Sequence, residues 1–167
     1  LKFVAIRYFN VAGADHDLRI GQSSKVSTHL IKVACEVAVG LKDQLKIFGN
    51  DYPTPDGSCV RDYVHVIDLA NAHIQALKYL EGGGESNILN CGYNQGYSVI
   101  EVIETLERTL NKTLPKTIAD RRPGDVASLV ASADKIQSVL DWTPQYHSLD
   151  TIIKSSYQWE EKLKAKR

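Results

Sequence analysis

The sequence predicts an α/β protein, because short apolar segments typical of strands alternate along the chain with longer segments of helical periodicity. The first segment, Leu1 to Phe9, reads L-K-F-V-A-I-R-Y-F. A nearly continuous apolar and β-branched run of this kind is typical of a parallel strand that is buried on both faces. Such a strand needs partners, so we expect a parallel sheet that is covered by helices.

The elements after this strand follow the same alternation. Val26 to Leu41 places its apolar residues on one helical stripe, and Gly40 near its end is a stop signal, so we predict a helix. We predict a short strand from Leu45 to Phe48. The Gly, Pro, Asn and Asp content of Gly49 to Gly57 predicts a surface loop, and Cys59 to Val66 is predicted to be extended.

A second helix is predicted from the apolar face between Leu69 and Leu80, which is followed by three consecutive glycines. Asn87 to Cys91 predicts another strand. Ser98 and Glu101 have the spacing of a capping box, so we expect a third helix to begin there.

Two further helices are predicted near the end of the sequence. Ser132 is expected to cap a short helix that stops near Trp142, and the last helix is expected to run from about Ser148 to Leu163. Lysines at the end of this last helix suit the negative end of its dipole. The chain contains no internal repeat and no low-complexity tract.

The composition indicates one globular domain with no preference for nucleic acid or membranes. Of the 167 residues 43% are hydrophobic, and 20 basic residues balance 20 acidic ones. This balance produces no long-range field toward nucleic acid or anionic lipid. The longest apolar run is too short to span a bilayer and the N-terminus lacks the features of a secretory signal, so we expect a cytoplasmic protein.

The three cysteines predict buried thiols. Cys35, Cys59 and Cys91 are widely spaced, with no C-x-x-C pair and no histidine at metal-ligand spacing. We therefore expect neither a disulfide framework nor a metal site.

Motifs for catalysis and for cofactor binding are absent from the sequence. It contains no G-x-G-x-x-G, no Walker A loop, no G-x-S-x-G and no H-E-x-x-H. None of the eight tyrosines is followed by a lysine four residues later. We therefore expect no catalytic and no cofactor-binding residue in this chain, and look instead for residues that hold a ligand.

Arginines near a rigid turn are the best candidates for holding an anion. The planar guanidinium gives two parallel charge-assisted hydrogen bonds to phosphate and keeps its proton. Arg61 and one of the adjacent pair Arg121 and Arg122, which precede a Pro-Gly turn, are the candidates. Asp125 beyond the turn either accepts hydrogen bonds from ribose hydroxyls or neutralises an arginine.

Five strings of the sequence, in this order and spacing, resemble the C-terminal half of UDP-glucose 4-epimerases, which are extended short-chain dehydrogenases. The strings are R-Y-F-N-V-A-G-A (Arg7 to Ala14), T-H-L-I (Thr28 to Ile31), K-I-F-G-N-D-Y (Lys46 to Tyr52), D-G-S-C-V-R-D-Y-V-H-V-I-D-L-A (Asp56 to Ala70) and R-R-P-G-D (Arg121 to Asp125). The resemblance covers essentially the whole chain.

This resemblance implies a division of labour within a longer protein. Residues from about 1 to 22 would supply one strand and a loop of the Rossmann sheet, about 23 to 147 the nucleotide-sugar-binding region, and about 148 to 167 the C-terminal helix. The N-terminal half, which in the family binds NAD and carries a Tyr-x-x-x-Lys pair, is missing here. We therefore expect Leu1 to be an interior residue, consistent with the absence of methionine.

The resemblance also implies the residues that bind the substrate. Asn10 matches a residue on the diphosphate and sugar side of the ligand, His29, Leu30, Lys46 and Phe48 match the segments that hold uracil, and Tyr63 lies in the matching V-R-D-Y string. The remaining matches are Arg61 and Arg122 for the pyrophosphate, Asp125 for the ribose and Leu129 for the sugar. Arg121 is expected to make a structural pair.

The implied activity is the interconversion of UDP-glucose and UDP-galactose. In the intact enzyme a tyrosine takes the proton of the 4-hydroxyl while NAD takes the hydride, and the 4-keto sugar rotates before the hydride returns. The matched residues would hold UDP during this rotation, and we expect the chain alone to be inactive. A homodimer is compatible with the family.

Leu129 stands where strict forms of the family have tyrosine. A smaller side chain there predicts that the enzyme also accepts UDP-N-acetylhexosamines, and the alternative is that Leu129 is a core residue. Two other functions also stay open: a related nucleotide-sugar dehydratase or decarboxylase, and a free-standing nucleotide-sugar binding module.

Overall fold

The computed structural model describes residues 1–166, which form five α-helices and nine β-strands. The strands are β1 (Val4–Tyr8), β2 (Asn10–Ala12), β3 (Leu45–Phe48), β4 (Val60–Arg61), β5 (Tyr63–His65), β6 (Asn87–Cys91), β7 (Tyr97–Ser98), β8 (Lys116–Ala119) and β9 (Ser128–Leu129). The helices are α1 (Leu30–Ala38), α2 (Val66–Glu81), α3 (Val99–Leu110), α4 (Asp134–Val139) and α5 (Leu149–Lys164).

Parallel pairing dominates the strands, which confirms the predicted α/β class. β1 pairs with β6, β2 with β5 and β3 with β8, each in parallel register. β4 lies between β7, which is antiparallel to it, and β9, which is parallel. Because parallel partners need a crossover connection, the helices occur between the paired strands in the sequence.

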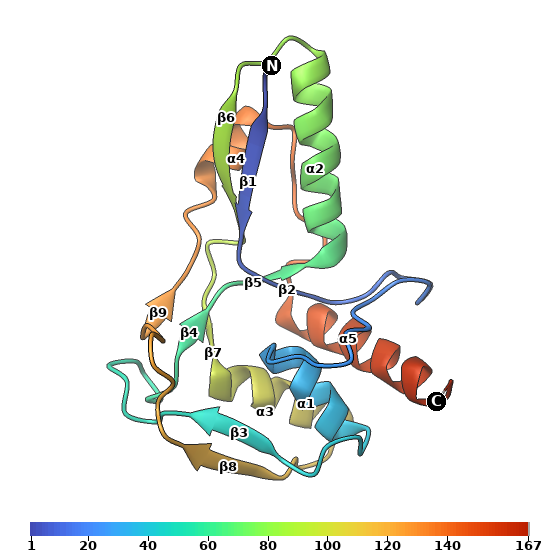
Figure 1. The fold of residues 1–167 in the computed structure, drawn as a ribbon, viewed down its shortest axis with the longest axis vertical. Helices are drawn as coiled ribbons and strands as arrows, with labels where there is room; N and C mark the ends of the chain where they lie inside the picture. The colour runs from blue at the N-terminus through green and yellow to red at the C-terminus, as the bar shows by residue number, and fades with distance from the viewer. Residues whose placement is uncertain (167) are drawn as a thin grey trace.

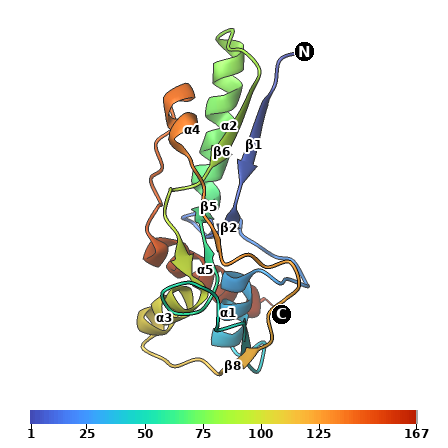
Figure 2. The same ribbon diagram turned by 90° about the vertical axis from the view of Figure 1, so that its left-hand side faces the viewer.

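The fold has two regions, stacked along its long axis (Figure 1). One contains β1, β6, α2 and α4, and the other contains α1, α3, α5, β3 and β8. β2 and β5 lie where the two regions meet. The view turned by 90° shows α2 and α4 on the same side of β1 (Figure 2).

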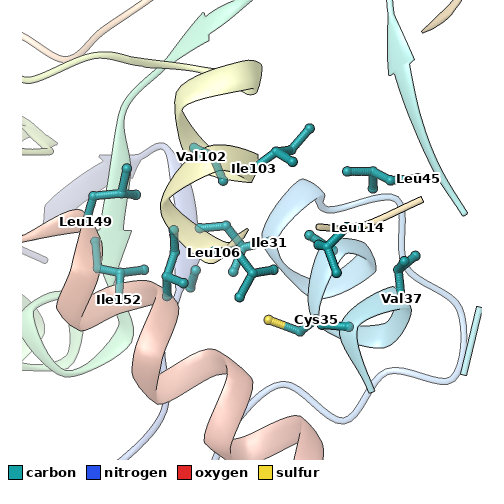
Figure 3. Close-up of a cluster of buried hydrophobic side chains, with 14 of the residues drawn as sticks. Ile31, Cys35, Val37, Leu45, Val102, Ile103, Leu106, Leu114, Leu149 and Ile152 are labelled. Carbon is teal, nitrogen blue, oxygen red and sulfur yellow. The ribbon is translucent and has the colours of Figure 1, made fainter. Parts of the chain in front are cut away.

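Each region has its own hydrophobic core. In the three-helix region, α1, α3 and α5 bring together buried side chains such as Ile31, Leu106 and Ile152, with Leu45 and Leu114 beside them (Figure 3). In the other region, α2 and α4 cover β1 and β6, and the core residues there are Leu69, Ala72, Leu89, Cys91, Ile136 and Trp142. A cavity adjoins the first core.

Several local predictions are confirmed. Ser98 Oγ accepts a hydrogen bond from the Glu101 backbone N–H at 3.0 Å, and the Glu101 carboxylate accepts one from the Ser98 backbone N–H at 2.6 Å, which completes the capping box of α3. Gly40 has a φ of 77° just after α1, as a helix stop requires. The helices α2 and α5 and the strands β3 and β6 also occur where they were predicted.

Within the described residues the first strand is covered on one face only. Val4 and Ile6 pack against the core under α2, but Ala5, Arg7 and Tyr8 are exposed. The physical reason is that β1 has a strand partner on one edge only and a helix on one face only within residues 1–166.

The predicted start of the first helix is wrong. Val26 is 87% exposed and lies in a loop, and α1 begins at Leu30 after His29 in an extended conformation. Ser27 Oγ accepts the His29 N–H at 3.1 Å, and a local hydrogen bond of this kind competes with helix formation. Val26, Ser27 and Thr28 of this loop line the cavity of the candidate site.

Two details near the C-terminal part differ from the predictions. Ala133, not Ser132, is the N-cap of α4, and no side chain caps this helix. β8 was not predicted, because its residues are mostly exposed and give no pattern of buried positions.

None of the helices within residues 1–166 has both the length and the apolar character needed to cross a membrane.

Candidate functional site

A cavity of about 820 Å³ lies beside α1, β3 and β4 and contains most of the predicted ligand-binding residues. Nine of the ten line it: Asn10, His29, Leu30, Lys46, Phe48, Arg61, Tyr63, Arg122 and Asp125. These residues are spread along the chain from Asn10 to Asp125. The fold therefore brings together nine residues that the resemblance to the family had assigned to one binding site.

The pleat of β3 explains how two of these side chains reach the cavity. Leu45 and Ile47 are buried in the core beneath the strand, whereas Lys46 is exposed and Phe48 half-buried. Successive side chains of a strand point to opposite faces, so Lys46 and Phe48 share the face that lines the cavity.

His29 lies at the N-terminus of α1 with an unusual environment. It is the N-cap residue, but its side chain makes no capping hydrogen bond. Both ring nitrogens are buried and have no hydrogen-bond partner among the described residues. Burial lowers the pKa of His29 below its ordinary value of 6.5, so the ring is neutral at pH 7 and offers a donor and an acceptor.

Arg61 and Tyr63 are positioned by the buried Asp62 between them. Asp62 accepts hydrogen bonds from the backbone N–H of Tyr93 at 3.1 Å and of Ala131 at 3.2 Å, and burial raises the pKa of its carboxyl. Gly92 permits this close packing, because a Cβ there would lie 2.3 Å from the Ala131 Cβ. Asp62 thus has a structural function and fixes the junction of β4 and β5.

Arg61 itself is held by backbone carbonyls. Its Nη1 donates to the oxygens of Val60 and Val126, both at 2.8 Å. Asn10 lies opposite Tyr63 in the β2–β5 pair, and its Nδ2 donates to the backbone carbonyl oxygen of Asp62 at 3.3 Å. These contacts orient three cavity residues before any ligand binds.

The two adjacent arginines have different partners. Arg121 donates to Asp51 Oδ1 at 2.7 Å and lies 4.1 Å from the centre of the Tyr52 ring, which confirms that it makes a structural pair. Arg122 lies over the Phe48 ring at 4.9 Å and donates to Asp125 Oδ2 at 2.8 Å.

The Pro-Gly turn brings Asp125 back toward the arginines. Gly124 has a φ of 86°, a left-handed conformation that other residues rarely adopt. Asp125 then lies within 3.5 Å of Arg61 as well as next to Arg122. Both arginines of the predicted phosphate site therefore share one carboxylate.

Leu129 is the predicted site residue that does not line the cavity. It is 47% exposed and belongs to neither hydrophobic core of the described residues. It lies on β9, directly opposite Arg61 in the parallel pair with β4.

Other residues of the cavity were missed from the sequence. The polar ones are Gln22, Ser24, Ser27, Thr28, Lys42 and Gln44, and the apolar ones include Val26, Val33 and Val99. Most lie in loops, where the sequence does not determine which way a side chain points. Gln44 had a usable signal, since it is two residues before Lys46 and alternation places it on the same face.

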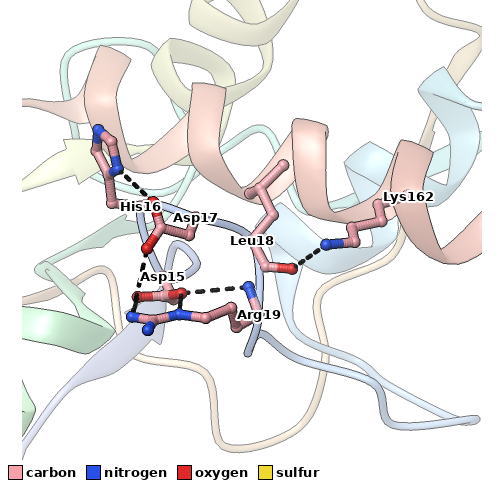
Figure 4. A network of polar contacts seen from close by, with 6 residues as sticks. All are labelled: Asp15, His16, Asp17, Leu18, Arg19 and Lys162. Carbon is pink, nitrogen blue, oxygen red and sulfur yellow. Dashed lines mark hydrogen bonds and ion pairs between the residues drawn. The ribbon is translucent and has the colours of Figure 1, made fainter.

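The loop that carries some of these residues is anchored to α5. Arg19 makes two hydrogen bonds to the Asp15 carboxylate, which lower the pKa of Asp15, and Lys162 donates to the Leu18 oxygen at 2.7 Å (Figure 4). Trp159 Nε1 donates to the Gln22 oxygen at 3.0 Å. The wall that contains Gln22 is therefore fixed at its α5 side.

The charge of the cavity favours an anionic ligand. Lys42, Lys46, Arg61 and Arg122 line it, and Asp125 is the one acidic residue among the lining residues. Within residues 1–166 no group of three or more His, Cys, Asp or Glu side chains is arranged to hold a metal ion. The fold and the cavity together define an α/β protein with a cationic cavity that suits an anionic ligand.

The chain belongs to the GDP-mannose 4,6 dehydratase family, whose model matches residues 1–155. It is 54% identical over 163 residues to the UDP-glucose 4-epimerase of Azospirillum brasilense, an alignment that covers 98% of this chain and 47% of the relative. The resemblance to UDP-glucose 4-epimerases is thereby confirmed. The chain spans about half the length of the curated relatives it matches.

Solved structures give the same result. A UDP-glucose-4-epimerase from Stenotrophomonas maltophila, with bound NAD and formylated UDP-arabinopyranose, is similar with a TM-score of 0.96 and 36% identity over 100% of this chain and 50% of that one. The UDP-Glc/GlcNAc 4-epimerase of Campylobacter jejuni has a TM-score of 0.80 and 46% identity, over 96% of this chain and 49% of that one.

Proposed function

We propose that this chain is the UDP-sugar-binding part of an NAD-dependent UDP-glucose 4-epimerase that interconverts UDP-glucose and UDP-galactose. The observation that carries the proposal is that nine residues expected to hold a UDP-sugar line one cationic cavity. The similarity to named UDP-glucose 4-epimerases supports it.

Arg61 and Arg122 hold the diphosphate in this proposal. Each charge-assisted hydrogen bond contributes about 1.5 to 3 kcal/mol. Asp125, which pairs with both arginines, accepts hydrogen bonds from the ribose hydroxyls of the bound ligand. Its carboxylate keeps the two guanidinium groups together before the phosphates arrive.

The remaining lining residues hold the two ends of the ligand. Leu30, Phe48 and the stem of Lys46 contact the uracil, and the unpartnered ring nitrogens of His29 offer it hydrogen bonds. Asn10 and Tyr63 lie toward the diphosphate and sugar. UDP does not react, so these contacts position the substrate and retain the intermediate while the sugar turns.

NAD does not fit the residues of this chain, because the sequence has no glycine-rich dinucleotide loop and no glycine lines the cavity. We assign its binding to another part of the protein. Bound there, NAD would supply the hydride transfer to and from the sugar. The same proposal divides the chain into a strand and loop of the Rossmann sheet (about 1–22), a nucleotide-sugar-binding region (about 23–147) and a C-terminal helix (about 148–167).

Leu129 is proposed to admit UDP-N-acetylhexosamines as further substrates. Its side chain lies on the strand next to Arg61, and it is smaller than tyrosine. The similarity to a UDP-Glc/GlcNAc 4-epimerase supports this extension.

The proposed compartment is the cytoplasm. Cys35, Cys59 and Cys91 are all free and buried, as is usual where thiols are kept reduced. The proposed assembly is a homodimer, and sedimentation of the protein at its natural length tests it.

The decisive experiment is an epimerase assay on the protein at its natural length, with UDP-glucose and NAD. We expect UDP-galactose to form, and its absence would reject the proposal. We expect no conversion by the 167 residues alone, and measurable turnover by them would contradict the assignment of the catalytic groups to another part. A binding module without chemistry is not favoured, because the relatives are named epimerases.

A further inference from the structure

The cavity has two cationic parts, which lie near opposite ends of β3. Arg61 and Arg122 both contact Asp125 at one end, and Arg122 also lies over the Phe48 ring there. Lys42 lines the same cavity from the turn that precedes β3. With a rise of about 3.3 Å per residue, β3 alone separates the two ends by about 10 Å.

A row of side chains connects these ends. Gln44, Lys46 and Phe48 alternate with the buried Leu45 and Ile47, and all three line the cavity. In Figure 1, β3 runs from beneath α1 toward the strands β4 and β9. A nucleotide with its diphosphate on Arg61 and Arg122 can therefore extend over this row, with its base toward Lys42.

Lys42 is oriented by an ion pair with a buried residue. Its Nζ lies 2.9 Å from Glu36 Oε2, and Glu36 is buried in α1. The backbone N–H of Lys42 also donates to the Glu36 oxygen at 3.3 Å. The side chain of Lys42 keeps 41% of its surface exposed, so its ammonium group can still donate to a ligand.

Glu36 is fixed in turn by a chain of charges that reaches α5. Lys32 Nζ lies 3.3 Å from Glu36 Oε1 and pairs with Glu160 of α5. Lys32, Glu36 and Glu160 are each at least nine-tenths buried. The two lysines and two glutamates of this chain alternate in sign, so Lys42 is the exposed end of a neutral, anchored network.

We propose that Lys42 determines the base specificity of the cavity by donating a hydrogen bond to the carbonyl oxygen at position 4 of uracil, and that Glu36 is its positioning residue. An ammonium group is a donor only. Uracil presents an acceptor at position 4, whereas cytosine presents an amino group there. The inference rests on the proposed function, since it assumes that UDP occupies the cavity.

The test compares UDP, CDP and inorganic pyrophosphate by calorimetry on the protein at its natural length. We expect Lys42→Met to weaken UDP binding about tenfold and to leave pyrophosphate binding unchanged. The preference for UDP over CDP should shrink in the same variant. Glu36→Gln should shift the UDP to CDP ratio in the same direction by a smaller factor, and Lys78→Met, an exposed lysine of α2, is the matched control.

The possible results distinguish a failure of the inference about Lys42 from a failure of the proposed function. Equal weakening of UDP and pyrophosphate by Lys42→Met would assign Lys42 to the phosphates and overturn the inference. Unchanged binding of all three ligands would also overturn it. Absence of UDP binding by the unmodified protein would reject the proposed function itself, and the inference with it.

Discussion

Arg122 and Asp125 are joined across the Pro-Gly turn by a 2.8 Å hydrogen bond, and the same carboxylate lies within 3.5 Å of Arg61. This arrangement predicts opposite effects of Asp125→Asn on two ligands. Removing the negative charge frees both arginines, so inorganic pyrophosphate should bind several-fold more tightly. UDP should lose its ribose contact, so the ratio of UDP affinity to pyrophosphate affinity should fall. An unchanged ratio, measured by calorimetry, would contradict the assigned function of Asp125.

The two adjacent arginines should differ sharply on substitution. Arg122→Ala should weaken UDP binding by about 10- to 100-fold, because it removes a charge-assisted contact to phosphate. Arg121→Ala should have little effect on binding, since Arg121 pairs with Asp51 and Tyr52. Titration of both variants with UDP checks the prediction. Comparable losses in the two would place Arg121 in the site as well.

Acidification should destabilise the fold through its buried histidines. Burial lowers the pKa of both His29 and His65 below 6.5. Below about pH 6.5 the unfolded chain binds protons that the folded chain does not, so the free energy of unfolding is retained above this pH and falls as the pH drops below it. Urea unfolding at about pH 7.5 and about pH 5.5 should show this loss. His29→Gln should reduce the difference, and an undiminished difference would mean that His29 does not contribute to it.

Removing the capping box of α3 should lower stability. Ser98→Ala loses the bond to the Glu101 N–H and a hydroxyl that also donates to Asp56, so the free energy of unfolding should fall by about 1 to 2 kcal/mol. Denaturant unfolding measures this change, with Ser23→Ala in an exposed loop as the control. A loss no greater than that of the control would show that the cap is dispensable.

Substrate range should depend on residue 129. In the protein at its natural length, Leu129→Tyr should reduce turnover of UDP-N-acetylglucosamine at least about tenfold while UDP-glucose is still converted. A coupled assay with both substrates checks this. If the unmodified protein does not convert UDP-N-acetylglucosamine, the proposed tolerance is wrong.

The sequence predicted features that depend on neighbouring residues better than features that depend on distant ones. Ser98 and Glu101 are three residues apart, so their capping box could be predicted directly. The alternation around Lys46 and Phe48 likewise predicts which side chains leave the core. By contrast, β8 is defined by its pairing with β3, about 70 residues earlier, and its exposed residues give no periodic signal.

The same distinction applies to the cavity. Arg122 and Asp125 could be proposed because their turn has a recognisable composition. Lys42 could not, because a lysine in a loop has no preferred direction until Glu36 of the folded α1 holds it. The exposure of Ala5 and Arg7 on β1 could not be predicted either, because the apolar run indicates where a strand lies but not how many neighbours it has.

The pairing of β3 with β8 has a consequence for the order in which the protein becomes functional. Leu45 is aligned with Lys116, and Arg61 and Arg122, the two arginines proposed to bind phosphate, are 61 residues apart in the chain. Contacts between such distant segments form slowly, because the intervening chain must first lose its entropy. If the proposed site is right, the nascent chain on the ribosome cannot bind a nucleotide until residue 125 has emerged. A ligand added during synthesis would stabilise only chains that have already passed this length.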